Sequence, residues 1–231
     1  GHEPGNGAGL AQNLLSTLDF RLTSQQTGEF EQRPRKRYDD TALIVAELVR
    51  LGPDTREGQA IIQRLNRIHS TYTIRQEDYA YVLSGFVAEP ICWIDRYGWR
   101  ALKPCEQEAL FLFWDHVGSL MNLEQRPRCL RELMELNQRT NLELFACAES
   151  NQLVADATVV MLLAPWPAPF HPWLRSIMRC LLEPETLSSL NWPSAPDWQT
   201  QALRVVLHCR SFILCTVRRF WAPKQRRFFS E

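Results

Sequence analysis

Two groups of polar residues lie at helical spacing in the first third of the chain. Asp40 and Thr41 follow Arg37 by three and four residues, so a helix places all three on one face. In a second segment with a helical pattern, His69 follows Asn66 by three residues, so these two also share a helical face. An arginine can hold a carboxylate, an aspartate can donate or accept a proton, and an imidazole can bind a metal. Arg37, Asp40, Thr41 and His69 are therefore the candidate functional residues.

Two of the five histidines, His69 and His116, fall on segments rich in aromatic and aliphatic residues. An imidazole in an apolar cavity suits axial ligation of haem iron, because the ring nitrogen is neutral there and water is excluded. A histidine near a helix C-terminus, such as His69, also meets the negative end of the helix dipole. That position favours the protonated form, which competes with metal binding. Spacing alone does not decide between a ligand and an ordinary hydrogen-bonded histidine.

Several better-known catalytic signatures are absent from the sequence. It has no phosphate-binding Gly-x-x-x-x-Gly-Lys-Ser/Thr loop, no Gly-x-Gly-x-x-Gly, no His-Glu-x-x-His and no Gly-x-Ser-x-Gly. The Glu-x-x-His pairs of a di-iron carboxylate bundle are missing as well. A catalytic site in this chain would therefore be assembled from dispersed residues.

The elements that position these residues are predicted to be helices. Apolar residues recur at the helical period, with Gly and Pro between the periodic segments, and no segment shows sustained period-two alternation or an internal repeat. The predicted helices cover about residues 10–22, 35–51, 56–72, 76–97, 104–126, 127–149, 152–163 and 198–221. The sequence therefore predicts an all-α protein with one globular domain over residues 1–231, of which residues 1–9 are disordered.

Charge is balanced over the whole chain but not along it. The 26 basic residues equal the 26 acidic ones, so no overall field recruits nucleic acid. From Arg204 onward, however, seven basic residues stand against Glu231 alone among acids, and aromatic residues are interleaved with them. Such a segment suits an anionic membrane surface, and a solvated helix end is the alternative interpretation.

The sequence predicts a cytoplasmic protein, with membrane association through its C-terminal segment as the alternative. No run reaches the roughly 18 apolar residues of a spanning helix, and no signal peptide is visible. Seven cysteines are scattered without a Cys-x-x-Cys pair, which is typical of reduced thiols in a cytosol.

Several stretches of the sequence together carry a family resemblance. The stretches are Gly28-Glu29-Phe30, Arg33-Pro34-Arg35-Lys36-Arg37-Tyr38-Asp39-Asp40-Thr41, Leu65-Asn66-Arg67-Ile68-His69, Tyr79-Ala80-Tyr81-Val82-Leu83, Trp93-Ile94-Asp95-Arg96-Tyr97-Gly98-Trp99-Arg100 and Phe113-Trp114. In combination they resemble the MpaB-type oxygenase family, which is named for an endoplasmic-reticulum-bound oxygenase of mycophenolic acid biosynthesis and is related to the rubber-cleaving latex clearing proteins. The strongest resemblance covers residues 27–123.

The resemblance implies an all-helical domain, globin-like in general character, that binds haem b. It further implies that dioxygen is used to oxidise or cleave a carbon-carbon double bond in an apolar isoprenoid or polyene-like substrate. In the latex clearing branch, a histidine after an Arg-x-x-Lys-Thr motif is the proximal haem ligand. His69 matches that histidine by order and approximate spacing, and Arg37, Asp40 and Thr41 fall on the motif. Arg37 and Thr41 are then expected to shape the haem or substrate pocket.

Two positions depart from the family pattern. Asp40 stands where the motif has a lysine, and we expect it to act as an acid or base or to orient dioxygen. His116 stands where close relatives are expected to have Arg or Lys, and it is the alternative or second axial ligand. Two functions without turnover are the alternatives: a haem or lipid carrier, and a helical interaction module that has no cofactor.

Overall fold

The computed structural model describes residues 34–72, 74–144, 149–182 and 184–221. Within these ranges the chain forms nine α-helices, one short 3-10 helix and no strand, so the all-α prediction is confirmed there. The helix predicted over residues 10–22 and the disorder predicted over residues 1–9 lie outside the described residues. The globin-like character and the single-domain assignment stay predictions. The helices are α4 (Pro34–Leu51), α5 (Arg56–His69), α6 (Gln76–Tyr97), α7 (Pro104–Leu120), α8 (Leu130–Leu144), α9 (Glu149–Leu163), η1 (Ala168–Phe170), α10 (His171–Leu181), α11 (Pro184–Ser189) and α12 (Asp197–Trp221).

A tight turn joins α4 to α5. Gly52 adopts a positive φ of 84°, a conformation that L side chains rarely take, directly after α4. Thr55 is the N-cap of α5, and its side-chain oxygen accepts a hydrogen bond from the Gly58 backbone N–H at 3.0 Å. The predicted end of one helix at residue 51 and the predicted start of the next at residue 56 are therefore confirmed.

α5 ends at His69, three residues before the predicted end at Tyr72. The Ser70 hydroxyl donates to the Arg67 carbonyl at 2.9 Å, and the Thr71 hydroxyl donates to the Ile68 carbonyl at 2.7 Å. These hydroxyls satisfy backbone carbonyl oxygens in the last turn of α5, so the helix can end there. His69 is consequently the final helical residue.

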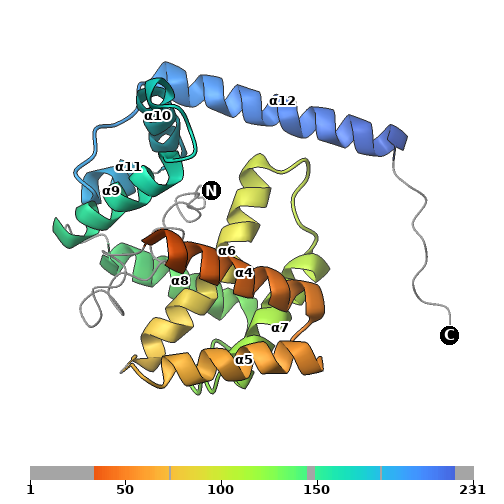
Figure 1. Cartoon of the computed structure of the whole chain (residues 1–231). Helices are drawn as coiled ribbons and strands as arrows, with labels where there is room; N and C mark the ends of the chain where they lie inside the picture. The colour runs from red at the N-terminus through yellow and green to blue at the C-terminus, as the bar shows by residue number, and fades with distance from the viewer. Residues whose placement is uncertain (1–33, 73, 145–148, 183, 222–231) are drawn as a thin grey trace.

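α6 lies at the centre of the fold, with α7 and α8 packed against it (Figure 1). The ring of Phe86 on α6 stacks on Trp114 of α7 at a centroid distance of 4.6 Å. Leu48 of α4 and Ile62 of α5 join the same buried cluster. Each fully buried aliphatic or aromatic side chain contributes about 1.5–3 kcal/mol, so this cluster fixes where α4 and α5 sit relative to α6.

The contact between α6 and α8 contains a buried chain of hydrogen bonds. Asn137 Nδ2 donates to Ser84 Oγ at 3.0 Å, and Asn141 Nδ2 donates to Asn137 Oδ1 at 3.1 Å. The Tyr81 hydroxyl donates to Asn141 Oδ1 at 2.7 Å. All four side chains are buried. Buried polar groups that satisfy one another in this way fix the register of two helices.

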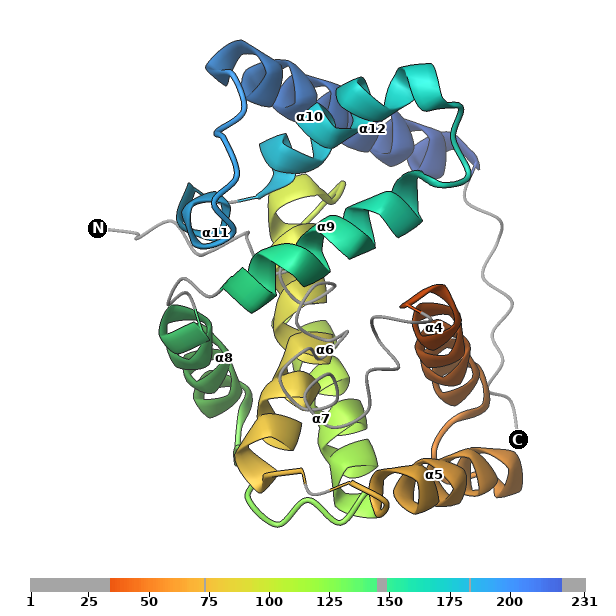
Figure 2. The same ribbon diagram turned by 60° about the vertical axis from the view of Figure 1, so that its left-hand side comes forward.

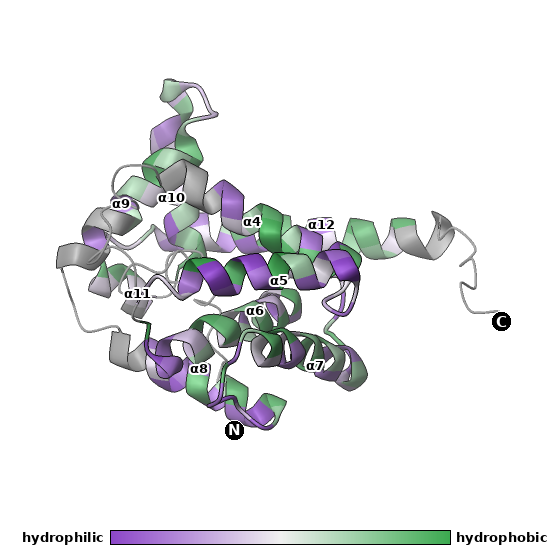
Figure 3. Cartoon of the chain, turned by 60° about the horizontal axis from the view of Figure 1, so that its bottom comes forward, coloured by the Kyte–Doolittle hydropathy of each residue, from purple (hydrophilic) through white to green (hydrophobic). Residues whose placement is uncertain are grey.

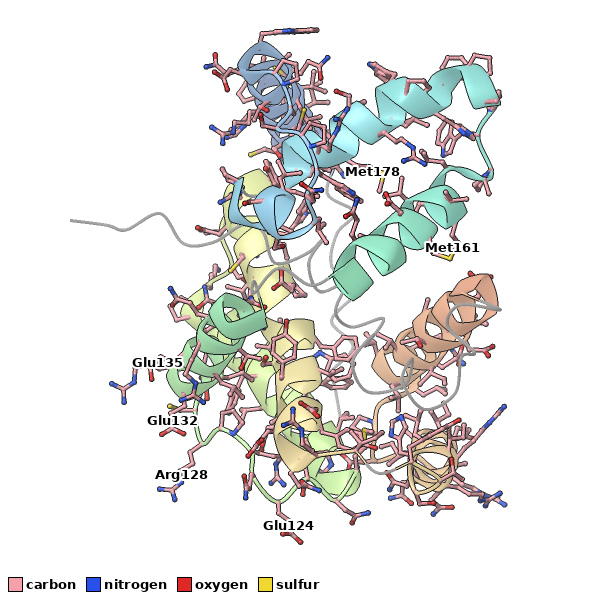
Figure 4. The ribbon with its side chains drawn as sticks, turned by 90° about the vertical axis from the view of Figure 1, so that its left-hand side faces the viewer. Glu124, Arg128, Glu132, Glu135, Met161 and Met178 are labelled. Carbon is pink, nitrogen blue, oxygen red and sulfur yellow. The ribbon has the colours of Figure 1, made fainter. Side chains whose placement is uncertain are left out.

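The opposite side of α8 is polar and faces solvent. Figure 4 shows Arg128, Glu132 and Glu135 directed away from α6. The Glu132 carboxylate also accepts the Arg128 backbone N–H at 2.8 Å, just before the helix begins. This separation of polar and core-facing residues is the helical pattern that the sequence predicted.

α10, α11 and α12 gather around the C-terminal end of α6, and α9 crosses toward α4 (Figure 2). The Ser211 hydroxyl of α12 donates to the Tyr97 carbonyl at the end of α6, at 2.5 Å. α12 packs mainly on α10 and on this end of α6, and the rest of it extends beyond the other helices (Figure 1).

α12 has a broad apolar surface that the described residues leave uncovered. Trp198 is 70% exposed and Phe212 is 74% exposed, and Val205, Val206 and Ile213 are exposed with them. Figure 3 shows hydrophobic residues recurring along the part of α12 that extends past its neighbours. Among the described residues, no helix combines the length and the apolar character that a membrane crossing requires.

Candidate functional site

His69 lies where the end of α5 meets the start of α6. Its ring is half-buried, with its centroid 5.3 Å from that of Tyr79 and the two planes tilted by 59°. The Nδ1 atom is shielded from solvent. On the same helical face, Leu65 packs against the core and Asn66 Nδ2 donates to the Leu120 carbonyl of α7 at 2.9 Å. The imidazole is therefore positioned by a helix that is anchored to both α6 and α7.

The Arg37 motif lies in the first turns of α4. Asp40 is exposed and Thr41 is half-buried. The side chain of Arg37 is outside what the structure describes. Figures 1 and 2 show α4 and α5 close together at their connecting turn and diverging toward the start of α4 and the end of α5. The Arg37 motif and His69 thus lie at the same end of this helix pair, the end at which α4 and α5 are farther apart.

His116 lies at the surface and contacts the turn between α4 and α5. Its Nε2 atom is 2.6 Å from the Asp54 carboxylate, and both side chains are substantially exposed, at 44% and 78%. The expectation of an apolar environment for His116 is therefore wrong, because Phe111, Trp114 and Val117 of the same helix are buried while His116 is at the surface. Its predicted role as an axial ligand is not tested by this contact.

Two further histidines have hydrogen bonds to nearby backbone carbonyls. The His171 ring contacts the Trp166 carbonyl at 2.8 Å, and the His208 ring contacts the Arg204 carbonyl at 2.7 Å. Within the described ranges, no cluster of three or more His, Cys, Asp or Glu side chains could hold a metal ion. Of the described histidines, His69 is the one placed between core helices.

Comparison with known proteins connects this geometry to a family. The family described as "ER-bound oxygenase mpaB/B'/Rubber oxygenase, catalytic domain" matches residues 3–213. The chain belongs to this family. Toward the C-terminus, the match extends about 90 residues beyond the segment of strongest resemblance, which ends at residue 123.

Two curated relatives of this mpaB/rubber oxygenase family member come from Penicillium. An ER-bound oxygenase mpaB' of Penicillium brevicompactum is 23% identical over 219 residues, which are 87% of this chain and 51% of the relative. An ER-bound oxygenase mpaB of Penicillium roqueforti is 26% identical over 165 residues, covering 64% of this chain and 55% of the relative. The chain thus spans about half the length of these relatives.

Sequence reasoning missed one group of polar residues in this family member. Arg96 at the end of α6, Arg179 on α10 and Arg204 on α12 line a common pocket. They come from three segments far apart in the sequence, so no motif or helical period relates them. Their only sequence signal is the excess of basic residues that begins at Arg204.

Proposed function

We propose that this protein is a haem b-dependent oxygenase that uses dioxygen to oxidise or cleave a carbon-carbon double bond in an apolar, isoprenoid or polyene-like substrate. The observation that carries the proposal is the position of His69 in a chain of the mpaB/rubber oxygenase family. Its imidazole is half-buried against Tyr79 on a helix anchored to the core. This is the setting in which a histidine can serve as an axial ligand.

The donor chemistry around His69 fits haem better than a metal bound by the protein alone. A single imidazole holds iron stably when the other ligands come with the cofactor, as they do in haem. Bound haem would supply iron for dioxygen chemistry. The protein's part is to keep the His69 ring oriented through α5 and to exclude water from it with Tyr79 and the neighbouring core.

We assign supporting roles to the residues at the start of α4. Arg37 and Thr41 shape the haem or substrate pocket, and Asp40 acts as an acid or base or orients dioxygen. Asp40 is exposed, so its carboxylate is accessible to water. His116 contacts Asp54 through Nε2, so we propose His69 as the principal axial ligand and His116 only as its alternative.

The test is the absorption spectrum of the full chain expressed with a haem precursor. We expect a Soret band that is lost or clearly shifted in His69→Ala. His116→Ala, which removes a surface histidine, is the matched control and should keep the wild-type spectrum. An unchanged Soret band in His69→Ala would show that another residue holds the iron.

The same haem-loaded protein also distinguishes the oxygenase function from the carrier alternative. An oxygenase should consume dioxygen and release a cleaved product when it is given a prenylated or polyene substrate. A haem-loaded chain without dioxygen consumption supports the carrier alternative. A colourless chain that cannot be reconstituted with haem supports the interaction module.

We also propose that the uncovered surface of α12 lies against an anionic membrane. Its exposed apolar residues are accompanied by the exposed Arg204 and Arg210, and the only acid in the helix is Asp197, in its first turn. This combination of apolar and basic residues is typical of helices that lie in a membrane interface. The names of the fungal relatives, which call them ER-bound, are consistent with such a contact.

Sedimentation with lipid vesicles tests the membrane contact. We expect the chain to sediment with vesicles that contain phosphatidylserine, less so at high salt, and several-fold less after Phe212→Ser with Ile213→Ser. Phe170→Ser, which changes an exposed aromatic residue outside α12, should have little effect. Equal sedimentation of all variants, or a stable dimer that does not bind vesicles, would contradict the proposal.

A further inference from the structure

A pocket of about 550 Å³ lies where the C-terminal end of α6 meets α10, α11 and α12. Its volume is in the usual range of small-molecule sites, about 300–1,000 Å³. Tyr97, in the last turn of α6, lines it, whereas Tyr79, in the first turn, contacts His69. At 1.5 Å per residue these two positions are about 27 Å apart along α6. The pocket is therefore separate from the proposed haem site.

The described charged side chains around the pocket are mostly basic. Arg96, Arg179 and Arg204 line it together with one carboxylate, that of Asp197. The guanidinium of Arg96 is placed over the Tyr97 ring, 5.9 Å from its centroid. Among the described lining side chains, guanidinium groups thus outnumber carboxylates, which favours an anionic ligand over a neutral one.

Arg179 provides the most specific indication of a ligand. Its Nε atom is buried, and no acceptor within the described part of the protein receives its hydrogen bond. A buried donor of a charged group without an acceptor is costly, and native structures rarely retain one unless it has a role. The same side chain lines the pocket, so a turn of its guanidinium would bring this donor to a ligand oxygen there.

Neutral donors and apolar side chains complete the lining. The first turn of α12 contributes Thr200, and the positive end of the dipole of this long helix points to the same space. The hydroxyls of Ser188 and Ser194 also line the pocket, and Trp192 and Leu187 provide apolar area. The pocket thus combines donors for an oxyanion with a surface for the rest of a small molecule.

We propose that this pocket binds the phosphate group of a small phosphorylated molecule, with Arg179 and Arg204 as its principal ligands. Arginine presents paired N–H donors that fit two phosphate oxygens at once, and a helix N-terminus adds a favourable partial charge. A bare phosphate is far smaller than the pocket, so the ligand carries a further organic or phosphate part against Trp192 and Leu187. The phosphate belongs either to a soluble ester or to a lipid headgroup.

Calorimetric titration of the full chain with pyrophosphate tests the proposal. We expect saturable binding that weakens with added salt and that becomes about tenfold or more weaker in Arg179→Gln and in Arg204→Gln. Arg175→Gln is the matched control, because Arg175 is exposed on α10 one turn before Arg179 and does not line the pocket. Because Arg204 is exposed, its variant should fold even if Arg179→Gln does not.

Vesicles of phosphatidylcholine with and without phosphatidic acid distinguish the two sources of the phosphate. Arginine-dependent binding of pyrophosphate alone assigns a soluble ester. Because α12 is itself expected to bind anionic vesicles, a headgroup is assigned by binding to phosphatidic acid vesicles in excess of that to phosphatidylserine vesicles of equal charge, if Arg179→Gln removes this excess. The proposal is overturned if neither probe binds, or if all three arginine variants bind both probes as the wild type does. A change in Arg175→Gln equal to that in Arg179→Gln would show general charge attraction instead of a site.

Discussion

Glu106, in the first turn of α7, forms an ion pair with Arg100 in the connection between α6 and α7. The Arg100 guanidinium donates two hydrogen bonds to its carboxylate, each 2.6 Å long, and the Lys103 backbone N–H donates a third at 2.8 Å. The hydrogen bonds from Arg100, followed by that from Lys103, lower the pKa of Glu106 to about 2. Both side chains of the pair are about a third exposed, so water screens the attraction in part.

The lowered pKa of Glu106 predicts a pH-dependent contribution to stability. The folded state holds this proton less tightly than the unfolded chain, in which the pKa of Glu is about 4.3. The stabilisation is thus complete above about pH 5 and disappears as the pH falls to about 2. We expect the unfolding free energies of wild type and Glu106→Gln to differ at pH 7 and to converge near pH 2.

Chemical denaturation between pH 7 and pH 2 measures this difference. Glu108→Gln is the control, because Glu108 is exposed on the same helix. A wild-type advantage that stays constant down to pH 2 would contradict the assignment to Glu106. The sequence predicted a helix start at residue 104, but it could not predict that Arg100 pairs with Glu106, since that contact depends on the path of the chain between α6 and α7.

Gly58 lets the α4–α5 turn pack tightly. A Cβ atom at this position would lie 2.0 Å from the Gly52 carbonyl oxygen, which belongs to the backbone and cannot move aside easily. Helix propensity alone favours alanine over glycine by about 1 kcal/mol, but this clash outweighs it. We expect Gly58→Ala to destabilise the protein by about 1–3 kcal/mol.

Thermal and urea unfolding of Gly58→Ala check this prediction. Gln59→Ala, at the adjacent exposed position in α5, should change stability by no more than about 0.5 kcal/mol. If Gly58→Ala stabilises the protein, the higher helix propensity of alanine outweighs the close approach to the Gly52 carbonyl, and the prediction is wrong.

Asn137 is the link between the buried polar groups of α6 and α8. Its amide donates to Ser84 and accepts from Asn141, so Asn137→Ala leaves a buried amide without its acceptor. We expect a loss of about 1–3 kcal/mol in unfolding free energy, measured by urea denaturation. Gln138→Ala, at an exposed position one residue along, should be nearly neutral. Equal losses in the two variants would mean that helix propensity is responsible.

Helices were the most predictable elements of this chain, because several have a clear apolar period and a residue that favours a helix start or stop. Gly52, Thr55 and Pro104 all stand where the structure begins or ends a helix. α8 begins at Leu130, three residues after the predicted start at Pro127. The hydrogen bonds that asparagines of α8 make to α6 were not predicted, since the position of a polar residue in a helical pattern does not indicate which residue it contacts.

At the scale of the whole molecule, the sequence predicted the family and the all-α class, and the family comparison and the described helices confirm both. It placed His69 correctly on a face with Asn66 that contacts the core. It did not predict the arginine pocket. The pocket arises from contacts between segments far apart in the chain, which periodicity and short motifs do not encode.

The central position of α6 has a consequence for the rate and order of folding. Its main partners, α7 and α8, follow it directly in the chain, so most of the core forms between neighbours in sequence. Local contacts of this kind favour rapid folding. The bond between Ser211 and Tyr97 instead closes a separation of 114 residues. We therefore expect docking of α12 onto α6 to be the slow, late event, and the arginine pocket is complete only once it has occurred.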